Sequence, residues 1–403
     1  MRSSKSSSRS IIVVILSTLL FLRIMVDGSE FVLFGQFKFT DFFAFVFISL
    51  YLLTVIGFPS RLAISSALLA LVLFLSTATS SLGIGNEGRT EILRTLGVFG
   101  AFLAGCRATK EKDFWFFISA LKLASSICAL VAIFQWISGQ GGVEVSSSIR
   151  YPGLMAGANN AAIIYSIAIV AQLVLSENSS LRRKRLVLSL NFLGLVLSLS
   201  VGGMLFLGVS FVIWSIFNSK KGKFQRFAIS SILIIAIPTL TYFNVPNFRS
   251  KITTSVFPVL EGNADARSSL QWRFESWKIY WQLGFEKPLF GQGYGTARNL
   301  SLNGLYMPHN ELLRLFVEIG VVGLLTFLFL YINSLIRLSK QYRKSGDEKT
   351  LFAFILLLAS LFVALGDNIF SNTPISIFLA VILGMTNSEK RNNSSYRNQN
   401  QNF

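Results

Sequence analysis

The chain of 403 residues is poor in the side chains that many soluble enzymes use for chemistry, with one histidine, two cysteines and 19 acidic residues. Cys106 and Cys128 both fall in apolar segments, which argues against a disulfide framework and against a cysteine metal site. No histidine cluster exists, and no acidic pair within an outer loop is spaced like metal ligands. The sequence therefore predicts a protein with no metal and no bound cofactor. It also leaves His309 as the only imidazole, the side chain whose ordinary pKa lies nearest neutral pH.

What the chain has in abundance is apolar surface. Hydrophobic residues make up 52% of it, including 38 phenylalanines, and the mean hydropathy is +0.58. A soluble domain cannot bury that much apolar surface, whereas a polytopic membrane protein need not. The net charge of +18 would suggest nucleic acid in a soluble protein. Here the basic residues lie mostly between apolar runs, so they indicate orientation in a membrane and no nucleic-acid partner.

We therefore expect an all-α polytopic membrane protein with about 12 transmembrane helices. The predicted spans are roughly 11–26, 42–57, 62–79, 92–106, 114–137, 153–175, 186–200, 203–217, 227–243, 312–336, 351–370 and 375–386. Several are shorter than the ~20 residues that cross a bilayer upright. The seventh and eighth are so close in sequence that we expect a tight hairpin.

The distribution of basic residues predicts the orientation. With a cytoplasmic N-terminus and an uncleaved first span, 23 of the 37 Lys and Arg residues fall on the cytoplasmic side. Both termini are then cytoplasmic. The predicted division is a basic tail over 1–10, spans one to nine over 11–243, a periplasmic catalytic loop over 244–311, spans ten to twelve over 312–386, and a polar, disordered cytoplasmic tail over 387–403.

The long outer loop is unusual because it is basic. Residues 244–314 hold eight Lys and Arg residues, although the other outer loops are nearly free of them. Residues 267–288 have a helical pattern that ends at Pro288. Its apolar stripe consists of Leu270, Phe274, Trp277, Trp281 and Phe285. We expect an amphipathic helix at headgroup level, since tryptophan favours the membrane interface.

His309 stands where this loop meets the tenth span. A helix N-terminus favours neutral imidazole, which can accept a proton, so His309 is a candidate general base. A capping or packing role is the alternative. Arginines expected at the same depth are Arg89, Arg94, Arg150, Arg267 and Arg273. Guanidinium groups bind phosphate oxygens in pairs of hydrogen bonds, although each arginine alone is more simply explained by headgroup contact. Asp367, a carboxylate near the outer end of the eleventh span, is read as an orienting group or as a partner of an arginine.

Two segments, WRFESWKIYWQLGFEKPLFGQGYGT and HNELLRLFVEIGVVGLLTFLFLYI, resemble the shared core of the O-antigen ligase and O-antigen polymerase family. The matching positions are Arg273, Trp277, Pro288, Leu289, Gly291, Gly293, His309, Asn310, Glu318, Gly320 and Gly323. A second element is matched by Arg150, Gly153 and Asn159, with Ala158 in place of the family's proline. The resemblance covers about residues 150–335. An arginine that members often carry in the hairpin is replaced by Val201.

The resemblance implies a C-type glycosyltransferase of the bacterial inner membrane that acts without a metal. Such an enzyme moves a glycan from a polyprenyl diphosphate carrier to a hydroxyl of a lipid- or glycan-linked acceptor at the periplasmic face. Polymerase and ligase both remain open. The resemblance implies catalysis by His309 and Arg273, and substrate binding by Arg150, Asn159 and Asn310. Arg267 and Arg89 are added as further substrate-binding residues because of their charge and their expected depth. The alternative is a twelve-span transporter or flippase of polyprenyl-linked glycans, which predicts internal repeats and charges in mid-span. No repeat is visible, and Lys122 is the only clear mid-span charge.

Overall fold

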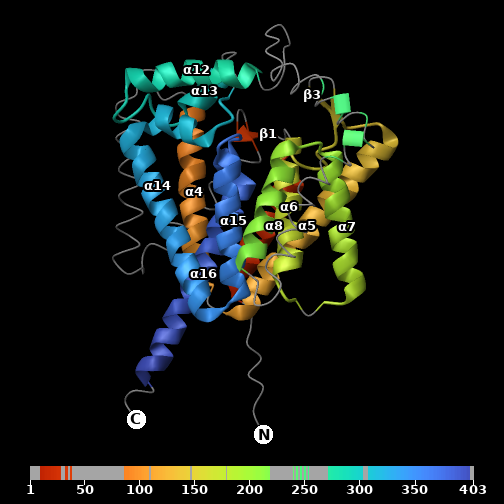
Figure 1. Ribbon diagram of the computed structural model, residues 1–403, viewed down its shortest axis with the longest axis vertical. Coiled ribbons are helices and arrows are strands. Elements are labelled where there is room, and N and C mark those ends of the chain that lie inside the picture. The colour runs from red at the N-terminus through yellow and green to blue at the C-terminus, as the bar shows by residue number, and fades with distance from the viewer. Residues whose placement is uncertain are drawn as a thin grey trace.

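The computed structural model describes residues 10–28, 32–34, 37–38, 86–108, 110–145, 148–177, 179–217, 271–302 and 307–399, with isolated positions between 239 and 253. These residues are mostly helical, as predicted. The long helices that run side by side in Figure 1 are α1 (Ile11–Met25), α4 (Asn86–Arg107), α5 (Glu111–Ser138), α6 (Ala158–Val174), α7 (Leu181–Leu197), α8 (Val201–Phe217), α14 (Glu311–Ser345), α15 (Glu348–Ala364) and α16 (Thr373–Gln399).

Each of these helices overlaps one of the predicted apolar spans. In the part of the chain that the structure describes, α5 and α14 are long and apolar enough to cross a membrane, and α1, α6, α8 and the first part of α16 are shorter apolar helices. The predicted spans 42–57, 62–79 and 227–243, the tail 1–9 and most of the loop 244–270 lie outside the described residues. The total of twelve spans and the periplasmic loop therefore stay predictions.

Two short hairpins depart from the predicted all-α fold. β1 (Val32–Phe34) pairs with β2 (Phe37–Lys38), and β3 (Val143–Val145) pairs antiparallel with β4 (Ser148–Arg150). Strands of two or three residues are too short to leave an alternating pattern, so the hydropathy of the sequence did not reveal them. The second hairpin matters for the site because it ends at Arg150.

Small residues bring the helices close together, as is common between helices in membranes. A Cβ atom added to Gly384 of α16 would lie 2.2 Å from the Phe102 carbonyl oxygen of α4. One added to Gly203 of α8 would lie 2.3 Å from the Cβ of Ala162 in α6. The α7–α8 hairpin, joined only by residues 198–200, confirms the predicted tight connection.

Helix α12 (Gln271–Glu286) lies across one end of the bundle, with the short α13 (Thr296–Leu302) close to it (Figure 1). The predicted helix is thus confirmed, and Pro288 follows its end. Its buried positions are Ser276, Tyr280 and Gly284, whereas three aromatic residues of the predicted stripe are turned outward. Phe274, Trp281 and Phe285 are each at least half exposed. This placement agrees with an interfacial helix.

Helix α14 is kinked at Gly320, which has a φ of 66°. The turn after α12 fits into the kink. Gln292 N donates to Val317 O at 2.7 Å, and Val321 N donates to Pro288 O at 2.7 Å. The kink makes Glu311–Ile319 a separate helical segment near the α12 end of the bundle. The continuous apolar run in the sequence did not predict this break.

The C-terminal tail differs from the prediction. Helix α16 runs to Gln399, so the backbone of most of the tail is helical where the sequence predicted disorder over 387–403. The physical reason is that residues 386–399 contain neither glycine nor proline to end the helix. Figure 1 shows this end of α16 at the opposite end of the bundle from α12.

Candidate active site

His309 lies at the α12 end of the bundle, two residues before α14 begins. Its Nδ1 is 3.0 Å from Oδ1 of Asp367, which lies between α15 and the single-turn helix η1 (Ile369–Ser371). A carboxylate only accepts hydrogen bonds, so this contact assigns the proton to Nδ1 and leaves the Nε2 lone pair available. The imidazole side chain is 28% exposed. It is therefore held on one side and open to a substrate on the other.

The capping role considered for His309 is wrong, because the next residue performs it. Asn310 is the N-cap of α14, and its Oδ1 accepts a hydrogen bond from Leu313 N at 3.1 Å. His309 itself has a left-handed backbone with a φ of 44°. The ring of Trp272 contacts the imidazole edge-on, with 5.1 Å between the ring centroids. The substrate contact proposed for Asn310 from the sequence stays a prediction.

Asp367 is ionised in this setting. Burial raises the pKa of its carboxyl group, but the hydrogen bond and charge of His309, the backbone N–H of Asn368 and the nearby charge of Arg273 lower it more. The net result is a pKa below the ordinary value for aspartate. A permanent carboxylate beside Nδ1 fixes the tautomer and stabilises an imidazolium if the ring is protonated.

Two guanidinium groups gather beside this pair. Arg273 donates from Nη1 to Gly366 O at 3.0 Å, and Arg150 is buried at the end of β4. Burial lowers the pKa of both groups, and the charge of Arg273 lowers that of Arg150 further. In each residue Nε is buried without a hydrogen-bond partner among the described residues. Two adjacent cations with unused donors form a site for an anion.

The structure does not show the remaining predicted site residues in contact with His309. Arg267 lies outside the described residues, and Arg89 is in the first turn of α4 with its side chain not described. Asn159 accepts a hydrogen bond from Ser200 Oγ at 3.0 Å, which connects the starts of α6 and α8. Of the predicted residues, the structure thus brings together His309, Arg273 and Arg150, and it adds Asp367.

A polar cavity of about 440 Å³ opens beside His309 and Asp367. Three arginines line it, and each contacts a carboxylate. Arg23 pairs with Asp27, while Arg94 and Arg298 lie 2.8 Å and 3.2 Å from the same oxygen of Glu91. Other lining residues carry amide or hydroxyl groups: Asn160, Asn368, Ser371, Asn372 and Thr373. Most of these residues could not be predicted to share a site, because they come from segments far apart in the chain.

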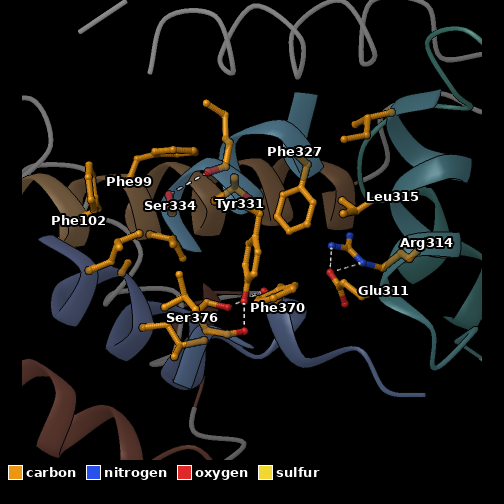
Figure 2. A pocket seen from close by; sticks show the side chains of 18 of the residues that line it. Phe99, Phe102, Glu311, Arg314, Leu315, Phe327, Tyr331, Ser334, Phe370 and Ser376 are labelled. Atoms are coloured by element: carbon orange, nitrogen blue, oxygen red, sulfur yellow. Dashed lines mark hydrogen bonds and ion pairs between the residues drawn. The ribbon is translucent and has the colours of Figure 1, made fainter. Parts of the chain in front are cut away.

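A second, apolar cavity of about 280 Å³ adjoins the first, between α4, α14, α15 and α16. Figure 2 shows its aromatic lining, with Glu311 and Arg314 paired at one end. Ser371 lines the polar cavity and its neighbour Phe370 lines the apolar one. Ser371 Oγ also donates to Glu311 Oε2 at 3.4 Å. The two cavities therefore share a wall.

Comparison with known proteins identifies part of the chain. Residues 186–328 match the family described as O-Antigen ligase. This segment is similar to the O-antigen ligase family. The resemblance seen in the sequence is thereby confirmed, and no curated protein matches the chain. Members of the O-antigen ligase family are integral membrane proteins, and the match supports a membrane glycosyl-transfer function.

Close backbone contacts around the kink explain two of the glycines that this chain shares with the O-antigen ligase family. A Cβ atom on Gly320 would lie 2.2 Å from Leu289 O, and one on Gly291 would lie 2.5 Å from Glu318 O. These positions let the turn and the kinked helix touch, which places His309 beneath α12. Trp277 Nε1 adds a hydrogen bond to Pro308 O. The matched segment contains His309 and Arg273 but neither Arg150 nor Asp367, which join the site through the fold.

The position of the family's hairpin arginine lies at this site as well. Val201 begins α8, and a Cβ atom on Gly202 would lie 3.7 Å from Asp367 Oδ2. Where the family often has an arginine, this chain therefore has the apolar Val201, and the next residue, Gly202, lies close to Asp367. Any role that an arginine plays there in members of the O-antigen ligase family cannot be assigned to Val201.

Proposed function

We propose that the protein transfers a glycan from a polyprenyl diphosphate carrier to an acceptor hydroxyl at the periplasmic face of the bacterial inner membrane, without a metal. One observation carries the proposal. The His309–Asp367 pair lies beside two guanidinium groups, those of the buried Arg150 and the half-buried Arg273, that make no ion pair within the described residues. A base and an anion site next to each other are the two features that this reaction requires.

In the proposed step, the acceptor oxygen attacks the anomeric carbon of the donor. Nε2 of His309 takes the proton from the acceptor hydroxyl. The bond between the anomeric carbon and the diphosphate oxygen breaks, and its electron pair leaves with the diphosphate. Asp367 orients the imidazole and stabilises the imidazolium that forms. A general base of this kind contributes on the order of 10²–10⁴-fold in rate.

The arginines act on the leaving group. As the glycosidic bond breaks, negative charge grows on the diphosphate. Arg150 and Arg273 are already fixed and desolvated, so they stabilise that charge without reorganising during the reaction. Guanidinium groups stay protonated at any physiological pH and match phosphate oxygens with paired donors. They therefore provide the charge that a metal ion provides in other transferases.

The transporter alternative has less support. Its strongest sequence signal was Lys122, the mid-span charge. In the structure Lys122 Nζ lies 2.8 Å from Glu177 Oε2, beyond the end of α6. A buried cation with a carboxylate partner is explained by structure alone. It gives no specific reason to propose a translocation path.

The proposal is tested with purified protein in proteoliposomes that contain a polyprenyl diphosphate-linked glycan and a candidate acceptor. The expected result is release of the free carrier diphosphate together with an extended acceptor. Movement of the intact donor across the bilayer without cleavage would instead support the transporter. In a deletion strain, loss of long chains with single units still attached indicates a polymerase, and loss of all attachment indicates a ligase.

A further inference from the structure

We propose that Trp272 is a positioning residue for the transfer reaction. Its indole ring contacts both the imidazole of His309, the proposed base, and the guanidinium group of Arg273, part of the proposed anion site, and it keeps the two groups at a fixed separation. Trp272 belongs neither to the matching positions of the family motif nor to the predicted apolar stripe. This inference rests on the proposed function and deepens it, because it names the side chain that sets the distance between the base and the leaving group.

The contacts of Trp272 reach both parts of the site. The centroid of its ring lies 5.1 Å from that of the His309 imidazole, and the two ring planes meet at 71°. Such an edge-to-face contact is a favoured arrangement of two aromatic rings. The Cζ atom of Arg273 lies 5.6 Å from the indole centroid. A guanidinium group within about 6 Å of an indole centroid is attracted by the negative face of the ring. One side chain therefore holds the base and the anion site together.

Both groups need this second contact, because their hydrogen bonds alone leave them free to turn. Nδ1 of His309 lies 3.0 Å from Asp367 Oδ1, and a ring held at one nitrogen can still pivot about that contact. Arg273 donates from Nη1 to Gly366 O at 3.0 Å, while its Nε has no hydrogen-bond partner among the described residues. Residues 366–367 thus hold both groups by hydrogen bonds, and the indole ring supplies each with a further constraint.

Helix α12 determines the position of the indole ring. Residues four apart lie on one face of a helix. Trp272 is half-buried and begins such a row, which continues with three buried residues, Ser276, Tyr280 and Gly284. The helix lies across the end of the bundle (Figure 1), and Trp277 Nε1 donates to the carbonyl oxygen of Pro308, the residue before His309. The helix that carries the ring is therefore tied directly to the segment that carries the base.

A fixed separation matters because the transfer exchanges two groups at one carbon. The acceptor oxygen at His309 and the diphosphate at Arg273 must both be in place around the anomeric carbon. A misplacement of about 1 Å can cost about 10²-fold in rate, even when it arises away from the reacting atoms. Indole suits this task, because it is a large, rigid group with only two side-chain torsions. Loss of the ring should therefore lower kcat more than it weakens the binding of either substrate.

The experiment compares Trp272→Leu and Trp272→Met, which remove the aromatic ring, with Trp272→Phe, which keeps one. Trp281→Leu on the same helix is the matched control, since Trp281 is 54% exposed and its ring contacts Phe285 and Phe316. The kcat per amount of folded protein and the KM values for donor and acceptor are measured in proteoliposomes. We expect both non-aromatic variants to lower kcat by about 10- to 100-fold with little change in either KM. Trp272→Phe and Trp281→Leu should stay near the wild-type kcat.

Three results would overturn the inference. The first is a kcat in Trp272→Leu equal to that of Trp281→Leu, or a Trp272→Phe variant that is no better than Trp272→Leu. The second is a raised KM with an unchanged kcat, which would make Trp272 a substrate-binding residue. The third is failure of both non-aromatic variants to fold, which would assign the ring to stability alone. Wild-type protein that transfers no glycan would instead contradict the proposed function, and that failure is seen before any variant is tested.

Discussion

At the scale of single residues, the fold brings Asp367 into contact with the proposed general base, His309. It lies 58 positions from His309 in sequence and contacts Nδ1 at 3.0 Å. Replacing Asp367 by Asn keeps the shape but removes the charge that fixes the tautomer. We expect a loss of activity on the order of 10²-fold, within the range by which a general base contributes. The measurement is the initial transfer rate at saturating donor and acceptor, with protein amount normalised in the membrane.

The pH prediction follows from Asp367. The pKa of Asp367 lies below its ordinary value, so the carboxylate form is present throughout the range above about pH 4. Its own titration therefore adds no change in rate between about pH 5 and pH 8. We expect the activity that depends on the Asp367 carboxylate to be lost only below about pH 4, as measured by the initial transfer rate. A loss of rate caused by protonation of this carboxylate between about pH 5 and pH 8 would contradict the assignment.

The arginines give a second residue-scale prediction. Arg273→Lys keeps a positive charge but loses the planar group of donors that matches phosphate oxygens. We expect a large loss of activity in Arg273→Lys and in Arg150→Lys, with normal insertion into the membrane. Lys278→Arg on the same helix α12 is a control, because the structure does not place Lys278 in the site. Full activity of both Arg273→Ala and Arg150→Ala would remove these residues from the mechanism.

Sequence reasoning at this scale found residues whose type is unusual in their setting. A lone histidine and arginines in an outer loop can be noticed in the sequence, and His309, Arg273 and Arg150 do come together. Asp367 was noted as a carboxylate in a late span, but its partner was not known. Arg298 and Asn368 could not be predicted, since nothing in their local sequence shows that two distant segments meet at one cavity.

At the scale of elements, the kink in α14 determines where His309 lies. Gly320 has a φ of 66° and no room for a Cβ atom, which would lie 2.2 Å from Leu289 O. Gly346 at the end of the same helix has the same φ but nothing within 4 Å of a Cβ atom. Gly346→Ala therefore measures only backbone strain, about 1–2 kcal/mol. We expect Gly320→Ala to cost more, because it adds a steric clash to that strain.

The two variants are compared by their thermal stability in detergent. It is measured as the fraction of purified protein that stays monodisperse after heating to a series of temperatures. Gly320→Ala should lose stability clearly beyond Gly346→Ala, and its transfer rate should fall. Equal midpoints for the two variants would mean that the turn at 288–293 is not tightly docked in the kink.

The elements show where hydropathy is informative. Long apolar runs predicted the helices well, because a segment in lipid must satisfy its backbone hydrogen bonds internally. The same runs hid the kink, since Gly320 sits inside a continuous apolar stretch. The short β-hairpins and the helical extension of α16 were also missed. Hydropathy carries no information on them, because they depend on local contacts or on the absence of helix breakers.

At the scale of the whole molecule, orientation is the prediction on which the site depends. The charge distribution predicts that residues 244–311 lie outside the cytoplasm. A cysteine introduced at Asn263 should therefore react with an impermeant thiol reagent added to intact spheroplasts. Background labelling should be low, because Cys106 and Cys128 are both buried. A cysteine at Ser394 in the predicted cytoplasmic tail is the control and should react only after lysis. Protection of position 263 until lysis would reverse the orientation.

The most direct test of the account is the transfer rate of His309→Asn in purified membranes. Asparagine is the suitable replacement, since it tolerates the left-handed backbone found at His309, with its φ of 44°. It can accept a hydrogen bond but cannot take a proton at neutral pH. We expect normal insertion and a rate about 10²–10⁴-fold below wild type. A near wild-type rate in His309→Asn would contradict the proposed base, while the family assignment of residues 186–328 would stand.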